Sequence, residues 1–377
     1  MTGNVFGERF VVVSFGESHG KGVGVVVDGV PAGLGLAESD IQPDLDLRRP
    51  GQSIVTTQRK ERDVVEILSG VFNGKTTGAP VAMMIRNTDV DSRSYESMVN
   101  TPRPSHADLA HRTKYQGFND YRGSGRASAR VTAGFVMAGA LAKKLLREEL
   151  GVEILAYTLE LGGIRAAGFT LEDARRKRYL NEVRCPDQAA AEEMKKLVVK
   201  CRGEGDSLGG IVECVALNLP VGLGEPVFGS LDSDLARMAL AIPAVKGVEF
   251  GSGFSAARLK GSQNNDQYFI DKTGRVATMT NNSGGVVGGV SSGEPLVYRT
   301  AFKPPASIAK RQRTVDISKN KEVDLVVPGR HDPVVVPRAV PIVECCTAIV
   351  LADHALRAGF ISPVVGGKRS KDDRERP

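Results

Sequence analysis

The chain has no tryptophan, and only 5% of its 377 residues are aromatic. This lack weighs against a nucleic-acid-binding protein, because many such proteins stack bases on aromatic side chains. The formal net charge of +6 and the pI near 9.0 keep that class open as an alternative. It would require a continuous basic face and an affinity for any duplex that falls steeply with salt. We expect no nucleic-acid partner.

Cysteine is scarce and irregularly spaced. The chain has five cysteines, an odd number, with no CxxC spacing and no neighbouring histidine pair. This pattern excludes a disulfide framework and gives no support for a zinc site. We therefore expect no metal, and five buried thiols: Cys185, Cys201, Cys214, Cys345 and Cys346.

Long uncharged hydrophobic runs are missing too. The most apolar stretch, residues 339–356, contains Glu344 and Asp353, which argues against a membrane span. The first twenty residues have no basic region followed by a long apolar region and a cleavage site, as a secretory signal would. We expect a cytoplasmic protein with no membrane partner.

What the chain does have is the composition of a globular protein, 41% hydrophobic and 25% charged. Two segments, 131–147 and 339–357, are apolar nearly all round, which predicts fully covered helices. Five apolar runs bounded by turn residues predict strands: 9–15, 22–29, 79–87, 209–219 and 323–329. We predict an α+β fold in which antiparallel β-sheets sandwich long central helices.

A weak internal repeat runs through the sequence. Residues 30–41 resemble 219–235, residues 69–86 resemble 284–300, and an arginine-bearing turn precedes each long apolar segment. Three matches in the same order favour an internal duplication. We predict one domain, residues 1–367, with two pseudo-repeated halves, followed by a charged mobile tail, residues 368–377.

Arginines recur in short Gly/Ser/Pro settings at four distant places: "DLRRPGQS", "TPRPSHAD", "YRGSGRASAR" and "PGRHDPV". Guanidinium groups bind phosphate and carboxylate through paired hydrogen bonds, so this scatter predicts a small polyanion held from several sides. The simpler interpretation is surface charge on loops. In the third motif, Arg126 and Arg130 precede an apolar helix whose free amides could receive an anion, although the Walker ending is missing. Lys143 lies near the far end of that helix.

Three residues could handle protons. His19 lies in a Gly/Ser turn and His106 in a proline-stiffened loop, and an imidazole with a pKa of about 6.5 exchanges protons near neutrality. Asp332 follows Arg330 by two residues and could instead simply cap a turn. Asn, Gln, Lys and Arg between residues 258 and 313 could hold a nucleotide-like cofactor, although the dinucleotide fingerprint is absent.

Taken together, the motifs resemble the chorismate synthase family. They run in order from "FGESHG" through "ERDVVEILSGVFNGKTTGAPV", "RPSHAD", "DYRGSGRASAR" and "GSQNND" to "GRHDPVVVPRAVPIVE". The resemblance implies a carbon–oxygen lyase of the shikimate pathway to aromatic amino acids. It removes phosphate from 5-enolpyruvylshikimate 3-phosphate by 1,4-anti-elimination to give chorismate. It also implies a requirement for reduced FMN without net redox change, and a homotetramer.

The resemblance also implies site residues. His19 matches the histidine that protonates the departing phosphate, His106 the one beside flavin N1, and Asp332 the carboxylate that relays a proton from flavin N5. Ser18 and Ser128 match helper residues. The matching substrate-binding arginines are Arg48, Arg103, Arg130 and Arg330. The matching flavin contacts are Arg48, Arg126, Ala127, Ser128, Ala244, Gly288, Lys303, Pro304, Pro305, Ala306, Ser307 and Arg330.

Two positions depart from the family pattern. Ile54 stands where many relatives carry an arginine, which weakens an anion contact there. Pro243 stands where an asparagine often precedes Ala244, which leaves only backbone for a flavin contact. Because no extra domain is evident, we expect reduced FMN to come from outside rather than from NADPH oxidised by this chain. A flavin-dependent oxidoreductase is the remaining alternative, and it would consume reductant.

Overall fold

The structure is a computed structural model that describes residues 3–51, 61–88, 92–96, 98–327 and 332–366. Three features singled out in the sequence fall outside this range. They are Arg330, Ile54 and the charged tail, residues 368–377.

The first half of the chain forms a five-stranded antiparallel sheet. On β7, Val81, Met83 and Ile85 are fully buried while the residues between them are not. This period of two directs one face of the sheet to the core. In spatial order the strands are β1 (Val5–Phe6), β2 (Val11–Gly16), β3 (Gly22–Asp28), β7 (Val81–Arg86) and β4 (Val65–Ile67).

The second half forms another five-stranded antiparallel sheet. Burial alternates along its second strand in spatial order, from Leu296 to Phe302, again with one face toward the core. In spatial order the strands are β11 (Val245–Phe250), β16 (Leu296–Phe302), β10 (Gly210–Leu217), β8 (Glu153–Leu161) and β9 (Ile164–Arg165).

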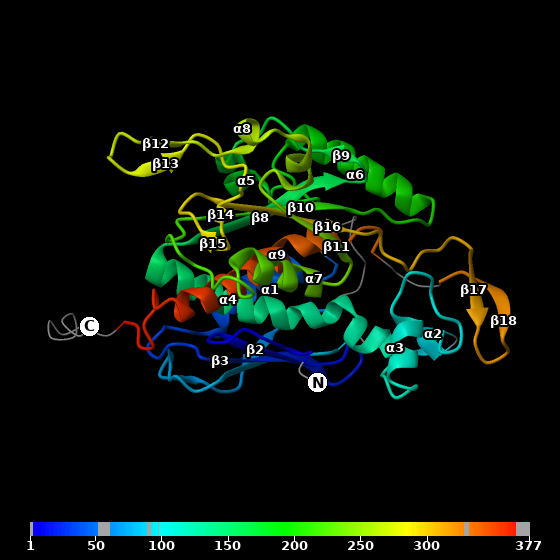
Figure 1. Ribbon diagram of the computed structural model, residues 1–377. Helices are drawn as coiled ribbons and strands as arrows, with labels where there is room; N and C mark the ends of the chain where they lie inside the picture. Colours follow the sequence, from blue (N-terminus) through cyan, green and yellow to red (C-terminus); the bar gives the residue numbers. More distant parts are fainter. Residues whose placement is uncertain (1–2, 52–60, 89–91, 97, 328–331, 367–377) are drawn as a thin grey trace.

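Two long helices, α4 (Thr132–Leu150) and α9 (Val336–Arg357), lie in the middle of the molecule. Helix α4 contacts β3 of the first sheet, α9 contacts β8 and β10 of the second, and the two helices pack on each other (Figure 1). Where they cross, a Cβ on Gly139 would lie 2.2 Å from the Cβ of Cys345, so only glycine fits. The helices predicted at 131–147 and 339–357 are confirmed, as is the α+β class.

Helix α9 is long and apolar enough to cross a membrane, although the sequence suggested that no segment was. It lies almost entirely inside the protein, as the core helix of a folded domain does, and thus implies no membrane. All five cysteines are free and buried, as predicted.

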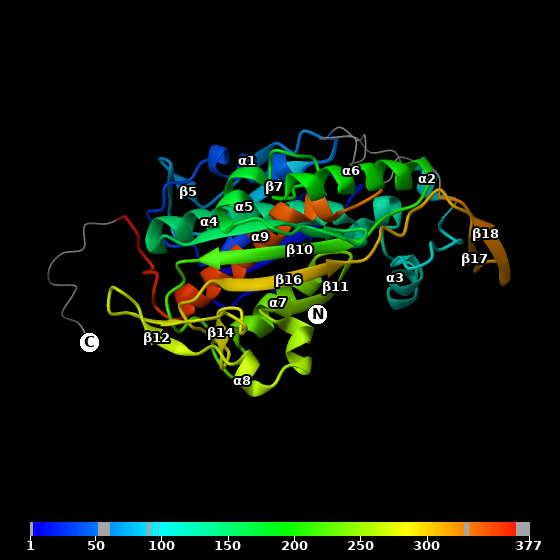
Figure 2. The same ribbon diagram turned by 90° about the horizontal axis from the view of Figure 1, so that it is seen from above.

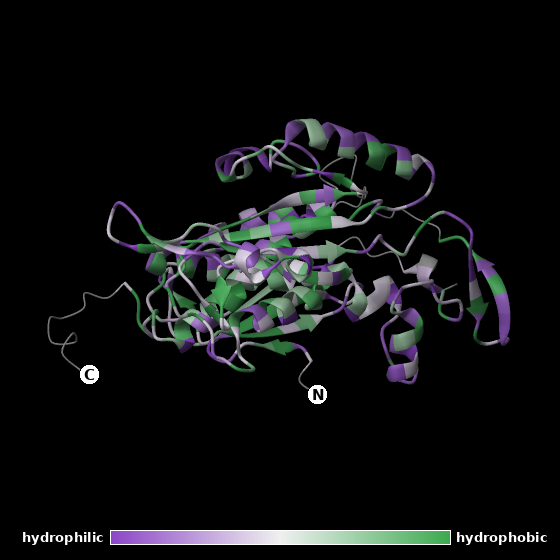
Figure 3. Cartoon of the chain, turned by 45° about the horizontal axis from the view of Figure 1, so that its top comes forward, coloured by the Kyte–Doolittle hydropathy of each residue, from purple (hydrophilic) through white to green (hydrophobic). Residues whose placement is uncertain are grey.

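Shorter elements surround this core. Helix α6 alternates polar and apolar residues, consistent with one packed face (Figure 3). The hairpins β12–β13 and β17–β18 project from opposite ends of the molecule (Figures 1 and 2). The remaining helices are α1 (Glu38–Arg48), α2 (Arg93–Glu96), α3 (Asp108–Lys114), α5 (Leu171–Lys177), α6 (Gln188–Gly203), α7 (Leu231–Ala241), α8 (Gly261–Asn264), and the 3-10 helices η1 (Arg122–Ala127), η2 (Ala129–Val131) and η3 (Gly253–Arg258). The hairpins pair β5 (Val71–Phe72) with β6 (Lys75–Thr76), β12 (Tyr268–Ile270) with β13 (Val276–Thr278), β14 (Val286–Val287) with β15 (Val290–Ser291), and β17 (Gln312–Asp316) with β18 (Lys321–Leu325).

The two sheets have matching strand orders. The order β2-β3-β7-β4 in the first corresponds to β8-β10-β16-β11 in the second. Helix α1 follows β3 as α7 follows β10, and the small hairpin β5–β6 precedes β7 as β14–β15 precedes β16. A long central helix then ends each half of the described fold.

Candidate active site

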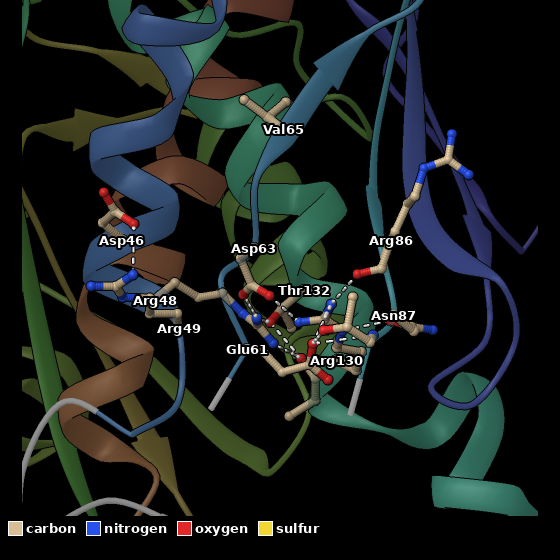
Figure 4. A network of polar contacts seen from close by, with 12 residues as sticks. Asp46, Arg48, Arg49, Glu61, Asp63, Val65, Arg86, Asn87, Arg130 and Thr132 are labelled. Atoms are coloured by element: carbon tan, nitrogen blue, oxygen red, sulfur yellow. Dashed lines mark hydrogen bonds and ion pairs between the residues drawn. The ribbon is translucent and has the colours of Figure 1, made fainter. Parts of the chain in front are cut away.

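Arg48 and Arg130 meet at a buried carboxylate, Asp63 (Figure 4). Arg48 is the last residue of α1, and Arg130 lies in the turn before α4. The Nη1 of Arg48 donates to Asp63 Oδ2 over 2.8 Å, and the Nη1 of Arg130 donates to Oδ1 of the same carboxylate. Arg48 also donates to the Ala129 carbonyl, at 3.0 Å. The structure thus brings together two of the arginines identified from the sequence.

Charge balance in this cluster shifts the pKa values of its members. Burial alone would raise the pKa of Asp63, but Arg48 and Arg130 outweigh it and lower the pKa below its ordinary value. Burial lowers the pKa of Arg48 to about 9, with Arg338 and Arg130 adding to this and Asp63 opposing it. The cluster therefore holds ionised groups of both signs at neutral pH.

Asp332 joins the same cluster through Arg338. Arg338 Nη1 donates to Asp332 Oδ2 over 2.5 Å, and Arg338 Nε donates to the Arg48 carbonyl over 3.2 Å. Sequence reasoning paired Asp332 with Arg330, which lies outside the described residues, and missed Arg338. The sequence signal for Arg338 was a single arginine in the first turn of a mostly apolar helix.

His19 lies in a pocket of small residues, as the Gly/Ser turn suggested. The ring is buried, and its Nδ1 lies 2.9 Å from Ser92 Oγ. Gly123, at a φ of 55°, approaches so closely that a Cβ there would be 2.4 Å from His19 Nε2. Next to the histidine, Ser128 Oγ donates to Ser18 Oγ over 3.2 Å. The predicted residues His19, Ser18 and Ser128 thus share one pocket.

His106 and Arg103 share a second carboxylate, Asp108. His106 Nδ1 lies 2.6 Å from Asp108 Oδ1, and Arg103 binds both oxygens of the same group at 2.7 Å. Burial alone would raise the pKa of Asp108, but Arg103 and His106 outweigh it and hold the pKa well below its usual range. Asp108 was missed from the sequence, although the motif "SHAD" places it two residues after His106.

Arg103 also ties this group to other predicted residues. Its Nη1 donates to Ser307 Oγ over 3.0 Å, and its Nη2 donates to Ser124 Oγ over 2.8 Å. Beside it is a cavity of about 190 Å³ whose lining includes Arg103, Asp108, Ser124 and Ala127. The site therefore has a small, partly apolar cavity beside Arg103 and Asp108.

Arg126, in the 3-10 helix η1, points toward the first sheet. Its Nη1 donates to the Gly16 carbonyl over 2.9 Å, and its Nη2 donates to Asn4 Oδ1 over 2.8 Å and to Ser14 Oγ over 3.1 Å. Burial lowers the pKa of Arg126. These bonds fix "FGESHG" against "GSGRAS", so Arg126 holds the two loops of the His19 pocket together.

The expected flavin contacts divide into two places. Lys303 N donates to the Ala244 carbonyl over 2.9 Å, so the residue after Pro243 and the segment 303–307 are adjacent. Burial and the nearby Lys246 lower the pKa of Lys303, as expected where positive charge is concentrated. Gly288, at a φ of 61°, lies between β14 and β15, at the other end of β16. Seven strand residues span about 20 Å, so one chain does not bring Gly288 to Lys303.

Hydrogen bonds join several of these groups into one region. Ser128 donates to Ser18, and Arg48 donates to the carbonyl of Ala129, the residue after Ser128. Arg338 donates both to the Arg48 carbonyl and to Asp332. Among the described residues, no group of three or more His, Cys, Asp or Glu side chains could hold a metal ion.

Comparisons with known proteins agree on one family. A model of the family described as chorismate synthase matches residues 10–356. The chain is 55% identical over 358 residues to a chorismate synthase of Korarchaeum cryptofilum, covering 95% of this chain and 99% of the relative. It is 52% identical over 363 residues to that of Methanosarcina mazei, covering 96% and 99%. The chain belongs to the chorismate synthase family.

A solved structure agrees with this assignment. A chorismate synthase crystal structure is 33% identical in sequence and superposes with a TM-score of 0.72, covering 94% of this chain and 93% of that one. The resemblance read from the motifs is therefore confirmed. As a chorismate synthase, the chain is a lyase of the pathway to aromatic amino acids.

Proposed function

We propose that the region from Ser18 to Asp332 is the site at which phosphate is eliminated from 5-enolpyruvylshikimate 3-phosphate. The observation that carries this is the continuous chain of contacts from the His19 pocket through Arg48 and Arg338 to Asp332. It combines side chains of both halves of the fold. A substrate with one phosphate and two carboxylates needs several cations around it, which the gathered arginines supply.

The residues divide the work by chemistry. Five arginines bind the anionic groups of the substrate: Arg48, Arg103, Arg130, Arg330 and Arg338. His19 donates a proton to the departing phosphate, and positive charge near that oxygen stabilises the leaving group. Ser18 and Ser128 orient the groups around His19. Asp332 takes up the proton that the elimination releases.

The residues next to these fit reduced FMN. The mostly apolar cavity beside Arg103 suits a heterocycle, and the backbone amides of the turn at 123–128 and the positive charge at Lys303 suit its phosphate. Arg48, Arg126, Ala127, Ser128, Ala244, Arg330 and the segment Lys303, Pro304, Pro305, Ala306 and Ser307 would hold it, with backbone alone at Pro243. Bound there, FMN supplies the electron-rich centre that assists breaking of unactivated C–H and C–O bonds. His106, held by Asp108, would keep a proton near the ring.

Gly288 and the exposed apolar residues of the second half support a homotetramer. Because Gly288 is remote from Lys303 within one chain, it would reach a flavin only from another copy. Large apolar side chains of the second half are exposed: Phe228 (95%), Phe254 (76%), Tyr268 (72%), Ile270 (66%) and Met279 (66%). Apolar patches of this kind mark association surfaces. Light scattering of the parent and of Ile270→Lys tests this, with a smaller assembly expected for the variant.

We further propose one domain, residues 1–367, formed by duplication. The matched strand orders and the matched positions of α1 with α7 and of α4 with α9 support the duplication. We propose a cytoplasmic enzyme that receives reduced FMN from an external source. Neither a membrane nor a nucleic acid enters this proposal.

The deciding experiment is anaerobic turnover of 5-enolpyruvylshikimate 3-phosphate with chemically reduced FMN. Chorismate and phosphate should appear in equal amounts without net consumption of reductant. Stoichiometric loss of reduced FMN would instead identify an oxidoreductase. Turnover with NADPH and oxidised FMN alone would show that the chain reduces its own flavin.

A further inference from the structure

Asp63 occupies an unusual place in the arginine cluster (Figure 4). Its side chain is completely buried, and its two oxygens accept hydrogen bonds from two different arginines. Those arginines stand on separate elements: Arg48 ends α1, and Arg130 precedes α4. Two like charges at close range repel each other strongly where water is excluded. The carboxylate between them offsets that repulsion.

The other bonds of the two arginines are largely to neutral groups. Arg48 donates to the Ala129 carbonyl and to Thr132 Oγ1, while Arg130 donates to Asn87 Oδ1 and the Arg86 carbonyl. Among the described residues, further charged neighbours are Glu61, whose Oε2 lies 3.8 Å from Arg130 Nη2, and Arg338, which adds positive charge. Neutral acceptors orient a guanidinium but do not cancel its charge. Asp63 bridges the two arginines and offsets part of their positive charge.

The backbone of Asp63 is itself held in place. Asp63 adopts a φ of 49°, in the left-handed region that aspartate tolerates better than most residues. Gln42, on α1, donates from Nε2 to the Asp63 carbonyl over 3.1 Å and accepts from the Val65 amide over 3.1 Å. One side chain thus fixes both ends of a short segment, and with it the direction of the carboxylate.

We propose that Asp63 is a positioning residue that holds Arg48 and Arg130 side by side for the anionic groups of the substrate. The inference rests on the proposed function, in which both arginines bind the substrate. Asp63 need not contact the substrate, because each arginine has five N–H donors and the hydrogen bonds named above use three of them. In Asp63→Asn, the amide keeps the shape of the carboxylate but no longer offsets the repulsion.

This role makes a prediction opposite in sign to simple electrostatics. If Asp63 only added negative charge near the anion site, Asp63→Asn would tighten anion binding. If Asp63 only stabilised the fold, the variant would melt at a lower temperature with unchanged affinity. As a positioning residue, its loss lets the two arginines separate. Anion binding then weakens although the site has become more positive.

The test compares Asp63→Asn with Glu66→Gln. Glu66 is a matched control three residues further on, where its carboxylate pairs with Arg86 on the surface. We measure KM and kcat for 5-enolpyruvylshikimate 3-phosphate, and calorimetric binding of the same compound and of inorganic phosphate. We expect about a 10-fold to 100-fold weaker affinity in Asp63→Asn, as for a lost charge-assisted contact, with a smaller change in kcat. Glu66→Gln should match the parent.

Unchanged or tighter binding by a folded Asp63→Asn variant would overturn the proposal. If that variant does not fold, Asp63→Glu retains the charge on a longer side chain, and Gln42→Met retains the charge but frees the backbone. Both should raise KM with little change in kcat, and parent-like KM in both would also overturn it. Arg130→Ala distinguishes a failure of the proposed substrate site from a failure of the proposed role of Asp63. If it leaves substrate binding unchanged, the proposed substrate site is wrong, whereas weakened binding there with parent-like Asp63 variants rejects only the role of Asp63.

Discussion

The two halves of the chain share a strand order but differ in what precedes their long helices. Before α4, the first half places three arginines within nine residues and a buried carboxylate that pairs with one of them. Before and within the first turn of α9, the second half places Asp332 and Arg338. The same framework thus carries a buried arginine cluster before one helix and an Asp332–Arg338 pair at the start of the other. Because α4 and α9 pack together, the starts of both helices can serve one site.

Both halves also expose large apolar side chains, but in different places. The second half exposes Tyr268 and Ile270 on the hairpin β12–β13, while the first half exposes Phe72 on β5 and Phe118 after α3. The two halves therefore differ in chemistry around the same strand order. The following changes each test one side of this contrast.

The largest effect is expected at Asp332, the carboxylate of the second half. Asp332→Asn retains the shape and can still accept from Arg338, but it takes up a proton far less readily. We expect turnover to fall at least ~100-fold, the range for loss of acid–base assistance, with substrate and reduced FMN bound nearly as well as by the parent. Anaerobic single-turnover kinetics with both ligands saturating measures this.

Asp324→Asn is the control, because Asp324 pairs with Arg311 on the exposed hairpin β17–β18. Near-parental single-turnover rates for Asp332→Asn would show that Asp332 caps a turn, the simpler interpretation of its sequence.

The next effect is expected at Arg130, in the first half. Arg130→Ala removes a charge-assisted contact to the substrate, which costs roughly 1.5 to 3 kcal/mol of binding free energy. KM for the phosphorylated substrate should rise accordingly. Arg165→Ala, on the exposed edge of the second sheet, is the control. Equal kinetics of the two variants would show that residues 126–130 do not form the anion-binding pocket.

Lys143 is not suited to that comparison. The sequence placed it near the far end of α4, but its Nζ donates to Asp44 over 2.7 Å and to the buried Glu344 over 3.1 Å. Removing it would leave a buried carboxylate without this partner, which destabilises a protein by several kcal/mol.

Much of this fold follows from sequence because its signals are local. Residues 131–147 and 339–357 are apolar on every side, and such segments become covered helices in whatever fold they enter. His19 was singled out because it lies in a Gly/Ser turn, where backbone can approach a ligand closely, whereas Ser18 came only from the family resemblance. By contrast, Asp63 and Arg338 were missed. Asp63 contacts Arg130, and Arg338 contacts the Arg48 carbonyl, and both partners are distant in the chain. Spacing alone carries no such information.

The next prediction concerns the crossing of α4 and α9, the long helices that end the two halves. Gly139 lies against Cys345, and a Cβ there would also approach the Cys345 Cα to 2.4 Å. Gly139→Ala should therefore destabilise the protein by overpacking, about 1 to 3 kcal/mol, lowering the melting temperature. Gly203→Ala, in α6 with no atom within 4 Å of its Cβ position, should not. Equal melting temperatures would mean that the helices separate without cost.

The smallest effect is a pH dependence of stability, which we expect from a histidine in α9 that α4 lacks. Histidine is absent from α4, whereas α9 carries the buried His354, whose Nε2 lies 3.1 Å from Asp234 Oδ2. Among the described residues no partner reaches its Nδ1, so a proton there would be buried without an acceptor. Burial lowers the pKa of His354, with Arg357 adding to this and Asp234 and Asp353 opposing it.

Because the folded state lowers this pKa, the unfolded chain takes up the proton first as the pH falls through about 6.5. The stability that depends on neutral His354 is complete above that pH and is lost below it, toward the lowered folded pKa. His354→Gln retains an N–H donor for Asp234 and cannot titrate. Urea unfolding at pH 7.5 and 5.5 should show a larger loss of free energy in the parent than in His354→Gln. Equal losses would mean that His354 is protonated as readily in the folded chain as in the unfolded one.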